Sequence, residues 1–391
     1  MSAATTKLLP FRLPAPEGGR VDLLVVAGEH SGDEQAARMV TELKTQRPEL
    51  ALAALGGPEV ERAGAQLLYD LTASSVVGLV EVLKNYSFFK ALFAEVLRWI
   101  EEHQPRAICF VDYPGLNLRL AAALRERGLS AKGGGKIKLL YYISPQIWAW
   151  KAKRRFTMAR DLDALAVIFP FEVACYQDTA LPVEFVGHPF VAADYIPPVR
   201  YDPAGPILLL PGSRTQAVER IFPVLLSAYQ RYRAAGGERE AVVIYPNDEV
   251  AAVLRRWPAP DCQLIKTGAT VAAAAVLTSS GTMSLHCALA GIPGAIVYRT
   301  NPLTYLLARW WVKLDYIGIA NLLLKEPMYP EFIQGAARAV PLAAQLQEGI
   351  GDRARLARTR EQVQRLRALL NQPAAGTAAD WLGRQLERTG Q

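Results

Sequence analysis

The chain has 391 residues, which is too long for a single hydrophobic core, and its 51% hydrophobic and 21% charged residues are ordinary for a globular protein of two domains. The four cysteines and four histidines are scattered without metal-ligand spacing, so we expect no disulfide framework, no metal and no cofactor. The formal charge of +7 favours anionic partners, and because no nucleic-acid-binding motif accompanies it, phosphorylated molecules or a membrane surface are preferred over nucleic acid.

Residues 1–19 are rich in proline, alanine and threonine and lack the apolar core of a signal peptide, so we expect a disordered N-terminal segment. From there short apolar runs alternate with longer amphipathic ones. The elements predicted up to residue 169 are strand 21–27, helix 31–46, strand 50–55, helix 88–102, strand 107–111, helix 116–127, strand 137–143 and strand 164–169. This alternation predicts βαβ units around a parallel sheet.

Five prolines between residues 189 and 206 interrupt the pattern and predict a linker. The alternation then restarts with strand 207–210, helix 216–233, strands 241–245, 263–265 and 275–278, helix 282–290 and strand 294–298, before an arginine-rich helical tail. We therefore expect two α/β domains that face a cleft and bind ligands at the carboxyl ends of their strands. The uncharged stretch 271–298 contains His286 and Pro293, so we expect no membrane span there and a cytoplasmic protein.

Two loops of the second half are suited to hold a diphosphate. They comprise Gly212, Ser213 and Arg214 after strand 207–210, and Ser280, Gly281 and Thr282 after strand 275–278. Glycine admits a ligand close to the backbone, free amides at a helix start attract phosphate, and Arg214 adds a permanent positive charge. Either loop alone could be an ordinary capped helix start, but two of them at strand ends favour a ligand site.

Two polar loops of the first half also follow strands. Glu29, Ser31, Gly32 and Asp33 follow strand 21–27, where the carboxylates could accept hydrogen bonds from sugar hydroxyls or the loop could be a capped turn. The loop lacks the GxGxxG spacing of a dinucleotide site, which argues against a dehydrogenase. Asp112 ends strand 107–111, where a half-buried carboxylate has a raised pKa and could act as a general base. The alternative is that Asp112 caps helix 116–127.

Aromatic residues adjoin cations in three segments. Trp148 and Trp150 precede Lys151, Lys153, Arg154 and Arg155. This composition suits a polar-headed ligand with an apolar body, or a core edge with a solvated face. Helices 88–100 and 303–316 are either membrane-surface contacts or core helices, and the arginine-rich run 353–367 is either a solvated face or a contact for anionic lipid.

Taken in chain order, these segments resemble the lipid-A-disaccharide synthase family over about residues 21–335. The matching pieces are Ala27-Gly28-Glu29, Ser31-Gly32-Asp33, Gly57-Pro58, residues 77–83, Asp112 with Pro114 and Asn117, Ser144-Pro145, Trp148-Ala149-Trp150, residues 169–172, Gly187-His188, residues 210–214, Ser280-Gly281-Thr282, Tyr298-Arg299, Lys313 with Asp315-Tyr316, and Asn321-Leu322-Leu323. Trp-Ala-Trp and Leu-Pro-Gly-Ser-Arg are the most specific of these, and no single piece suffices.

The resemblance implies a metal-independent, inverting glycosyltransferase of the B-type fold. That fold is α/β, with two Rossmann-like domains facing a cleft and C-terminal helices returning to the first domain. Residues 20–195, with a helix at about 370–391, would bind the acceptor, and residues 205–369 would bind the UDP-sugar. The implied reaction transfers 2,3-diacylglucosamine from UDP-2,3-diacylglucosamine to 2,3-diacylglucosamine 1-phosphate, giving the β-1,6-linked disaccharide 1-phosphate and UDP.

Carried onto this sequence, the resemblance makes Asp112 the general base on the acceptor's 6-hydroxyl. The implied donor contacts are Gly212, Ser213, Arg214, Ser280, Gly281, Thr282, His286, Asn321, Glu331 and Gln334. The acceptor contacts predicted alongside them are Glu29, Ser31, Gly32, Asp33, Trp148 and Trp150. The resemblance also implies peripheral association with the inner membrane and allows a homodimer.

Several residues depart from the family pattern. His286 stands where the family usually has Glu, and a neutral imidazole accepts one hydrogen bond at most where a carboxylate accepts two from a ribose. His30 replaces a small residue, and Gly115 replaces an acidic one. These departures leave two alternatives open. The chain could be a UDP-sugar glycosyltransferase or epimerase of the same fold acting on a non-acylated sugar, or a non-catalytic paralogue.

Overall fold

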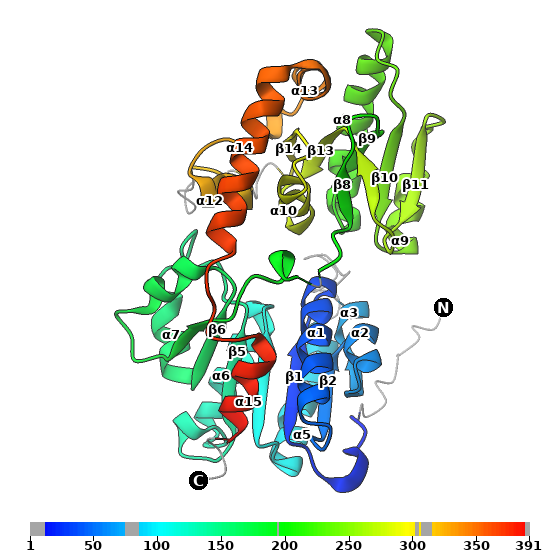
Figure 1. Ribbon diagram of the computed structural model, residues 1–391. Coiled ribbons are helices and arrows are strands. Elements are labelled where there is room, and N and C mark those ends of the chain that lie inside the picture. The colour runs from blue at the N-terminus through cyan, green and yellow to red at the C-terminus, as the bar shows by residue number, and fades with distance from the viewer. Residues whose placement is uncertain (1–11, 75–85, 194, 302–304, 306–314, 388–391) are drawn as a thin grey trace, which may run out of the picture. The chain divides into compact units, whose positions relative to one another are not determined.

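The computed structural model of the chain describes residues 12–74, 86–193, 195–301, 305 and 315–387. Contacts divide the chain into two compact units, one formed by Met1–Pro189 with Pro373–Gln391 and the other by Phe190–Gln372. Each unit is a parallel sheet with helices on both faces (Figure 1). The predicted α/β fold class with two Rossmann-like units is therefore confirmed. Residues 77–83 and most of the predicted helix 303–316 lie outside the described residues.

The first unit contains a seven-stranded sheet of order β3-β2-β1-β4-β5-β6-β7. Its strands are β1 (Leu23–Ala27), β2 (Leu52–Gly56), β3 (Gln66–Asp70), β4 (Ala107–Val111), β5 (Lys138–Tyr142), β6 (Ala164–Val167) and β7 (Val183–Phe185). Its helices are α1 (His30–Gln46), α2 (Pro58–Arg62), α3 (Leu71–Ser74), α5 (Tyr86–His103), α6 (Pro114–Glu126), α7 (Arg154–Asp161) and α15 (Ala378–Glu387), with the 3₁₀ turn η3 (Pro170–Tyr176).

The second unit repeats this plan in a six-stranded sheet of order β11-β10-β9-β13-β14-β15 beside a two-stranded ladder of β12 and β8. Its strands are β8 (Val199–Tyr201), β9 (Ile207–Leu210), β10 (Ala241–Tyr245), β11 (Cys262–Lys266), β12 (Val271–Ala273), β13 (Ala275–Ser279), β14 (Gly294–Tyr298) and β15 (Glu331–Ile333). Its helices are α8 (Thr215–Ala234), α9 (Asp248–Leu254), α10 (Thr282–Leu289), α12 (Ile319–Leu324), α13 (Ala339–Gly351) and α14 (Arg353–Leu370).

Successive residues of β1 face opposite sides of the first sheet and join two separate cores. Leu24 and Val26 pack with α5, α6 and α7, whereas Leu23 and Val25 pack with α1, α2 and α15. All five residues of β1 and of β4 are buried, as expected for a parallel sheet covered on both faces. This double covering explains why the apolar runs of the sequence located these strands.

The strand order places a topological switch point in each sheet. In the first sheet, the strands that follow β1 in the chain are added on one side of it up to β3, and β4 then begins the other side. In the second sheet the same change of side occurs between β9 and β13. The connections leave from the carboxyl ends of these strands on opposite sides, which opens a crevice where ligands bind in such sheets. The loops after β1, β4, β9 and β13 are therefore the first places to look for a site.

The N-terminal segment is not disordered throughout. The backbone amide of Leu13 donates to Glu95 Oε1 at 2.8 Å, and the indole Nε1 of Trp99 donates to the Pro14 carbonyl at 2.8 Å. Leu13 is buried in the core formed with α5. The prediction of disorder over residues 1–19 is therefore wrong for residues 12–19. The same contacts make the C-terminal half of α5 a core helix, which is the alternative to membrane contact that the sequence left open.

The predicted linker at residues 190–206 is also partly structured. Residues 199–201 form β8 and pair with β12, a ladder that apolar periodicity could not reveal because each strand has three residues. Phe190 and Tyr195 pack on His286 of the same unit.

The arginine-rich helix α14 is held to the second unit by its arginines. Arg355 donates to the carbonyl oxygens of Gly294 and Met328, and Arg367 donates to that of Leu289. Arg365 pairs with Glu326 at 2.9 Å. Arg355 is half-buried by these contacts, whereas the other five arginines of the run are exposed, so the run is largely the solvated face that the sequence predicts, with three of its arginines also bonded to neighbouring elements.

The C-terminal helix α15 packs on the first unit, against α1. Trp381, Leu382 and Leu386 of this helix, drawn in red in Figure 1, belong to the same buried core as β1 and α1, as their burial shows. Arg384 pairs with Glu184 of β7. No helix within the described residues is long and apolar enough to cross a membrane.

Candidate active site

Two carboxylates meet at the switch point of the first sheet. Ala27 of β1 pairs with Val111 of β4, so Glu29 and Asp112 follow neighbouring strands at the same edge. Glu29 is the N-cap residue of α1, and its charge acts on Asp112. Both side chains are half-buried. The structure thus brings together two of the predicted site residues that lie 83 positions apart in the sequence.

The backbone around Asp112 fixes the direction of its carboxylate. Asp112 and Tyr113 have φ of 45° and 47°, in the left-handed region that is costly for residues with a side chain. The Asp112 carbonyl accepts from the Tyr141 hydroxyl at 2.5 Å and from Asn117 Nδ2 at 2.7 Å, and its amide donates to the Tyr142 carbonyl at 2.9 Å. Tyr113 is the N-cap of α6, and no side-chain cap bond forms there. The alternative that Asp112 caps this helix is therefore not supported.

Burial and the neighbouring Glu29 raise the pKa of Asp112 to about 6, although a hydrogen bond from the Tyr113 amide opposes them. A carboxylate with this pKa is largely ionised at neutral pH and more basic than an exposed aspartate. This pKa also lies close to neutral pH, and a general base is most effective when its pKa is close to the pH of the reaction. The position therefore suits proton abstraction from a hydroxyl group.

The contact between Tyr113 and Gly28 was not predicted from the sequence. A Cβ at Gly28 would lie 2.1 Å from Tyr113 Cδ1, so the phenol ring occupies the space that any larger residue would need. Gly28 thus lets Tyr113 pack across the end of β1 while the chain turns sharply after Asp112. The glycine in the motif signals a close approach, but its partner cannot be read from the sequence.

The loop after β1 divides into an exposed and a buried part. Glu29 and Ser31 are half-buried and can meet a ligand, whereas Gly32 is buried against the Val111 carbonyl. Asp33 is fully buried, and its carboxylate accepts from the amides of Gly57, Glu59 and Val60 at 2.8, 3.0 and 3.3 Å. Asp33 therefore anchors the start of α2, and its contact with the acceptor stays a prediction.

The two tryptophans of the Trp-Ala-Trp motif have different surroundings. Trp148 donates its indole N–H to Glu172 Oε1 at 3.1 Å and packs edge-on against Phe169 and Phe171. Burial raises the pKa of Glu172 to about 8, against the effect of the N–H donors around it. Trp148 therefore holds the loop to η3. Trp150 is 44% exposed, with Lys151 Nζ lying 4.5 Å from its ring centroid, so it remains available to a ligand.

The second switch point brings the two predicted diphosphate loops together. Leu210 of β9 pairs with Thr278 of β13, and the loops follow directly. Gly212 has φ of 117°, and a Cβ there would lie 3.3 Å from Ser279 Oγ. Ser213, Arg214, Gly281 and Thr282 are exposed, and Ser280 is half-buried. Two helix N-termini, those of α8 and α10, and one guanidinium thus converge on one edge, which suits a diphosphate.

His286 lies one turn into α10 but is enclosed by aromatic rings. Only 7% of the residue is exposed, its ring centroid lies 3.9 Å from that of Phe190, and Tyr195 stacks at 5.7 Å with an interplanar angle of 10°. The Tyr195 hydroxyl lies 3.3 Å from both ring nitrogens. Burial lowers the pKa of His286 to about 4, so the ring is neutral. The structure gives His286 a packing role, and its direct contact with the donor stays a prediction.

The remaining predicted donor contacts support the loops beside β14. Asn321 is fully buried and exchanges hydrogen bonds with the Tyr329 backbone, and it also donates to Glu331. Glu331 accepts from the amides of Ile317 and Gly318 ahead of α12. These bonds give Asn321 a supporting role and Glu331 a capping role, and the contact of either residue with the donor stays a prediction. Gln334 bonds the amide and carbonyl of Thr300 at 3.2 and 3.1 Å, at the carboxyl end of β15.

Comparison with known proteins decides the family. A family model described as "Lipid-A-disaccharide synthetase" matches residues 23–382. The chain belongs to the lipid-A-disaccharide synthetase family. It is 36% identical to "Lipid-A-disaccharide synthase 1" of Legionella pneumophila (strain Lens), over 84% of this chain and 87% of that protein. It is 33% identical to the lipid-A-disaccharide synthase of Geobacter sulfurreducens, over 93% and 98%. The resemblance noted in the sequence is thereby confirmed, and membership of this family makes the chain a glycosyltransferase.

Solved structures agree on the fold. The UDP-GlcNAc 2-epimerase of Methanocaldococcus jannaschii, solved with UDP-GlcNAc and UDP, superposes with a TM-score of 0.56 at 8% identity, covering 94% of this chain and 99% of that one. The calicheamicin glycosyltransferase CalG4 superposes with a TM-score of 0.55 at 14% identity, covering 95% and 100%. At these identities the likeness shows the shared B-type glycosyltransferase fold alone.

Proposed function

We propose that the chain transfers 2,3-diacylglucosamine from UDP-2,3-diacylglucosamine to the 6-hydroxyl of 2,3-diacylglucosamine 1-phosphate. The products are the β-1,6-linked disaccharide 1-phosphate and UDP. The observation that carries this proposal is the position of Asp112 at the first switch point, with a raised pKa and a fixed backbone, in a chain of this family. Residues 20–195 with the C-terminal helix bind the acceptor, and residues 205–369 bind the donor.

Asp112 acts as the general base in this proposal. Its carboxylate removes the proton of the 6-hydroxyl as that oxygen attacks the anomeric carbon of the donor. The new carbon–oxygen bond forms on the face opposite UDP, the bond to the UDP oxygen breaks, and UDP leaves with the electron pair. The anomeric centre is inverted as a result. Glu29 sustains the basicity of Asp112 through its charge.

The two loops at the second switch point stabilise the leaving diphosphate. Arg214 supplies a positive charge with a planar set of donors, and the N-termini of α8 and α10 supply amides and their dipoles. These groups interact more strongly with UDP as negative charge grows on it in the transition state. They therefore lower the barrier to transfer as well as bind the donor. Ser280, Gly281 and Thr282 complete this subsite together with Gly212 and Ser213.

We also propose that the protein is cytoplasmic and associates peripherally with the inner membrane, as a monomer or homodimer. Supporting this, Trp150 and Phe156 are 44% and 49% exposed, and the ring of each lies beside a cation, Lys151 and Arg155 respectively. Amphipathic aromatics beside cations favour an anionic interface.

The reaction is tested by incubating the protein with both substrates and measuring UDP and disaccharide in parallel. We expect equal amounts of the two products, and no UDP from the donor alone. Release of UDP without disaccharide, or conversion of the UDP-sugar into its epimer, would instead support the alternative enzymes of this fold. A folded protein that binds the donor but gives no product would support the non-catalytic alternative.

A further inference from the structure

A cavity of about 720 Å³ adjoins Asp112 in the first unit. It is lined by Pro114, Gly115, Leu118, Arg119, Lys151, Ala152, Lys153, Arg154 and Thr157. Pro114 and Gly115 open α6 only two and three residues after Asp112, so the cavity lies beside the general base. Its volume is within the usual range of small-molecule sites.

The charge of this cavity has one sign. Four of its nine lining residues are cations and none is acidic. Within the described part of the chain, Lys151 and Arg154 form no ion pair with a carboxylate, whereas Arg155, the next residue, is held by Asp178 at 2.6 Å. Cations that face a cavity without a neutralising partner favour an anionic ligand there.

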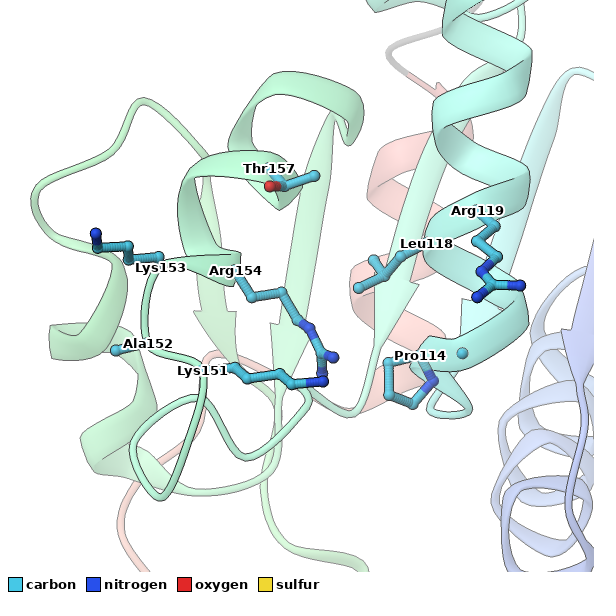
Figure 2. A pocket seen from close by; sticks show the side chains of 9 residues that line it. Pro114, Leu118, Arg119, Lys151, Ala152, Lys153, Arg154 and Thr157 are labelled. Carbon is cyan, nitrogen blue, oxygen red and sulfur yellow. The ribbon is translucent and has the colours of Figure 1, made fainter. Parts of the chain in front are cut away.

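Lys151 and Arg154 are held on the same side of their segment. Lys151 has φ of 53°. The amide of Arg154, one turn further along the chain, donates to the Lys151 carbonyl at 2.9 Å. Both cations lie over Trp150, at 4.5 and 5.6 Å from the ring centroid. Figure 2 shows both side chains directed toward Pro114 and the first turn of α6, while that of Lys153 points away.

Two further features of the cavity favour a phosphate group that is attached to a larger molecule over a phosphate ion alone. Pro114, Leu118 and Ala152 give the cavity apolar walls, and its volume far exceeds that of a phosphate. The first turn of α6 adds its positive dipole end. Burial raises the pKa of Tyr141 well above its usual value and Arg154 opposes this, which places Arg154 near the tyrosine whose hydroxyl binds the Asp112 carbonyl.

We propose that Lys151 and Arg154, above Trp150 and opposite the start of α6, form the subsite for the phosphomonoester of the glycolipid acceptor. This inference rests on the proposed function and assigns its acceptor specificity to a cavity. Because α6 begins two residues after Asp112, a phosphate held in this subsite directs the 6-hydroxyl, at the other end of the sugar ring, toward the side of that carboxylate. The subsite therefore also orients the nucleophile.

The test compares two acceptors, 2,3-diacylglucosamine with and without its 1-phosphate, in neutral detergent micelles. For the Lys151→Ala, Arg154→Ala double variant we expect the KM of the phosphorylated acceptor to rise about 10- to 100-fold, because two charge-assisted hydrogen bonds are lost. The KM of the unphosphorylated acceptor and of the donor should change by less than about twofold, so the preference for phosphate disappears. Arg154→Lys should restore part of it.

Arg160→Ala is the matched control, since it removes one positive charge from α7 at a residue that does not line the cavity, and it should leave both acceptors unchanged. An equal loss with both acceptors would show a merely structural role and overturn the proposal. So would an effect of the double variant that appears only when anionic phospholipid is added to the micelles, because the bound phosphate would then belong to a membrane headgroup.

Failure of this proposal is distinguishable from failure of the proposed function. If the wild-type protein transfers no sugar at all, the function fails. The cavity is then tested by calorimetric titration of the wild type and the double variant with glucosamine 1-phosphate and with glucosamine. Binding of the phosphate by the wild type alone supports the subsite, and equal binding by both proteins overturns it.

Discussion

The pKa of Asp112 is the residue-scale property on which the proposed chemistry depends. Burial and Glu29 raise it to about 6, and the base must be ionised to accept a proton. We therefore expect kcat/KM to be level above about pH 7 and to fall tenfold per pH unit below about pH 6. Steady-state rates between pH 5 and 8 measure this limb.

Glu29→Gln removes one of the two causes of the raised pKa. The acid limb should move to lower pH, because a neutral amide no longer disfavours the Asp112 carboxylate. The plateau rate should fall as well, since a weaker base accelerates proton transfer less. Ser31→Ala, in the same loop, is the control and should leave the position of the limb unchanged. A limb that does not move in Glu29→Gln would mean that burial alone sets this pKa.

Ionised Asp112 also lowers the stability of the fold. Because its folded-state pKa is raised, folding is favoured by protonation, and this contribution is fully present below about pH 4 and is lost as pH rises through about pH 6. Asp112→Asn should therefore increase the free energy of unfolding at pH 7.5 by about 1–2 kcal/mol, with little gain at pH 4. Urea unfolding at the two pH values measures the difference. A variant that is less stable at pH 7.5 would contradict it.

Substitutions of Arg214 and of His286 should affect the donor KM differently. Arg214→Ala removes an exposed guanidinium from the diphosphate loops and should raise the donor KM about tenfold or more. His286→Phe preserves the stack with Phe190 and Tyr195, so the donor KM should change by less than about threefold. Donor KM values at saturating acceptor check both. A larger effect of His286→Phe than of Arg214→Ala would show that the imidazole contacts the donor directly.

Among the elements, α2 depends on a carboxylate from another helix. Asp33→Ala leaves the amides of Gly57, Glu59 and Val60 without their acceptor, which should lower the free energy of unfolding by about 1–3 kcal/mol. Glu34→Ala, an exposed neighbour on α1, should cost less than about 0.5 kcal/mol. Denaturant unfolding compares the two. The KM for the acceptor should hardly change in Asp33→Ala, and a selective rise would mean that Asp33 reaches the ligand.

Most elements could be predicted because their burial pattern is simple. Strands 107–111, 207–210, 241–245 and 294–298 have the predicted bounds, since uninterrupted apolar runs mark strands covered on both faces. By contrast, β3 is half-buried at the edge of its sheet, and β7, β8 and β15 have three residues each. Such strands are specified by pairing with a distant neighbour, which leaves little trace in local periodicity.

The site loops could be located in the same way, but the role of each side chain in them could not. A polar loop at a strand end indicates a ligand edge, and residues 212–214 and 280–282 do lie together. Asp33, Asn321 and Glu331 look equally functional in the sequence, yet their partners are backbone amides and carbonyls up to 27 positions away. Whether a polar side chain faces a ligand or a neighbouring loop is decided by tertiary packing.

At the scale of the whole molecule, the chain returns to complete its first unit. Trp381, Leu382 and Leu386 of α15 are buried there and together contribute about 5–9 kcal/mol, which is comparable with the total stability of a domain. A chain ending at Gln372 should therefore lose soluble, cooperatively folded protein, and a synthetic peptide of residues 373–391 should restore it in part. Circular dichroism melting of the two forms measures this. An unchanged melting curve after truncation would show that α15 is dispensable.

The assignment of Asp112 as general base depends on all three scales. The order of the strands places the residue, the strained turn directs its carboxylate, and burial raises its pKa. The turnover number of Asp112→Asn tests this assignment most directly, measured as disaccharide formed at saturating donor and acceptor beside the wild type. We predict a loss of about 10²–10⁴-fold with donor KM unchanged, since an amide cannot accept the proton. A variant that is folded, binds both substrates and retains a rate within about threefold of the wild type would contradict the account.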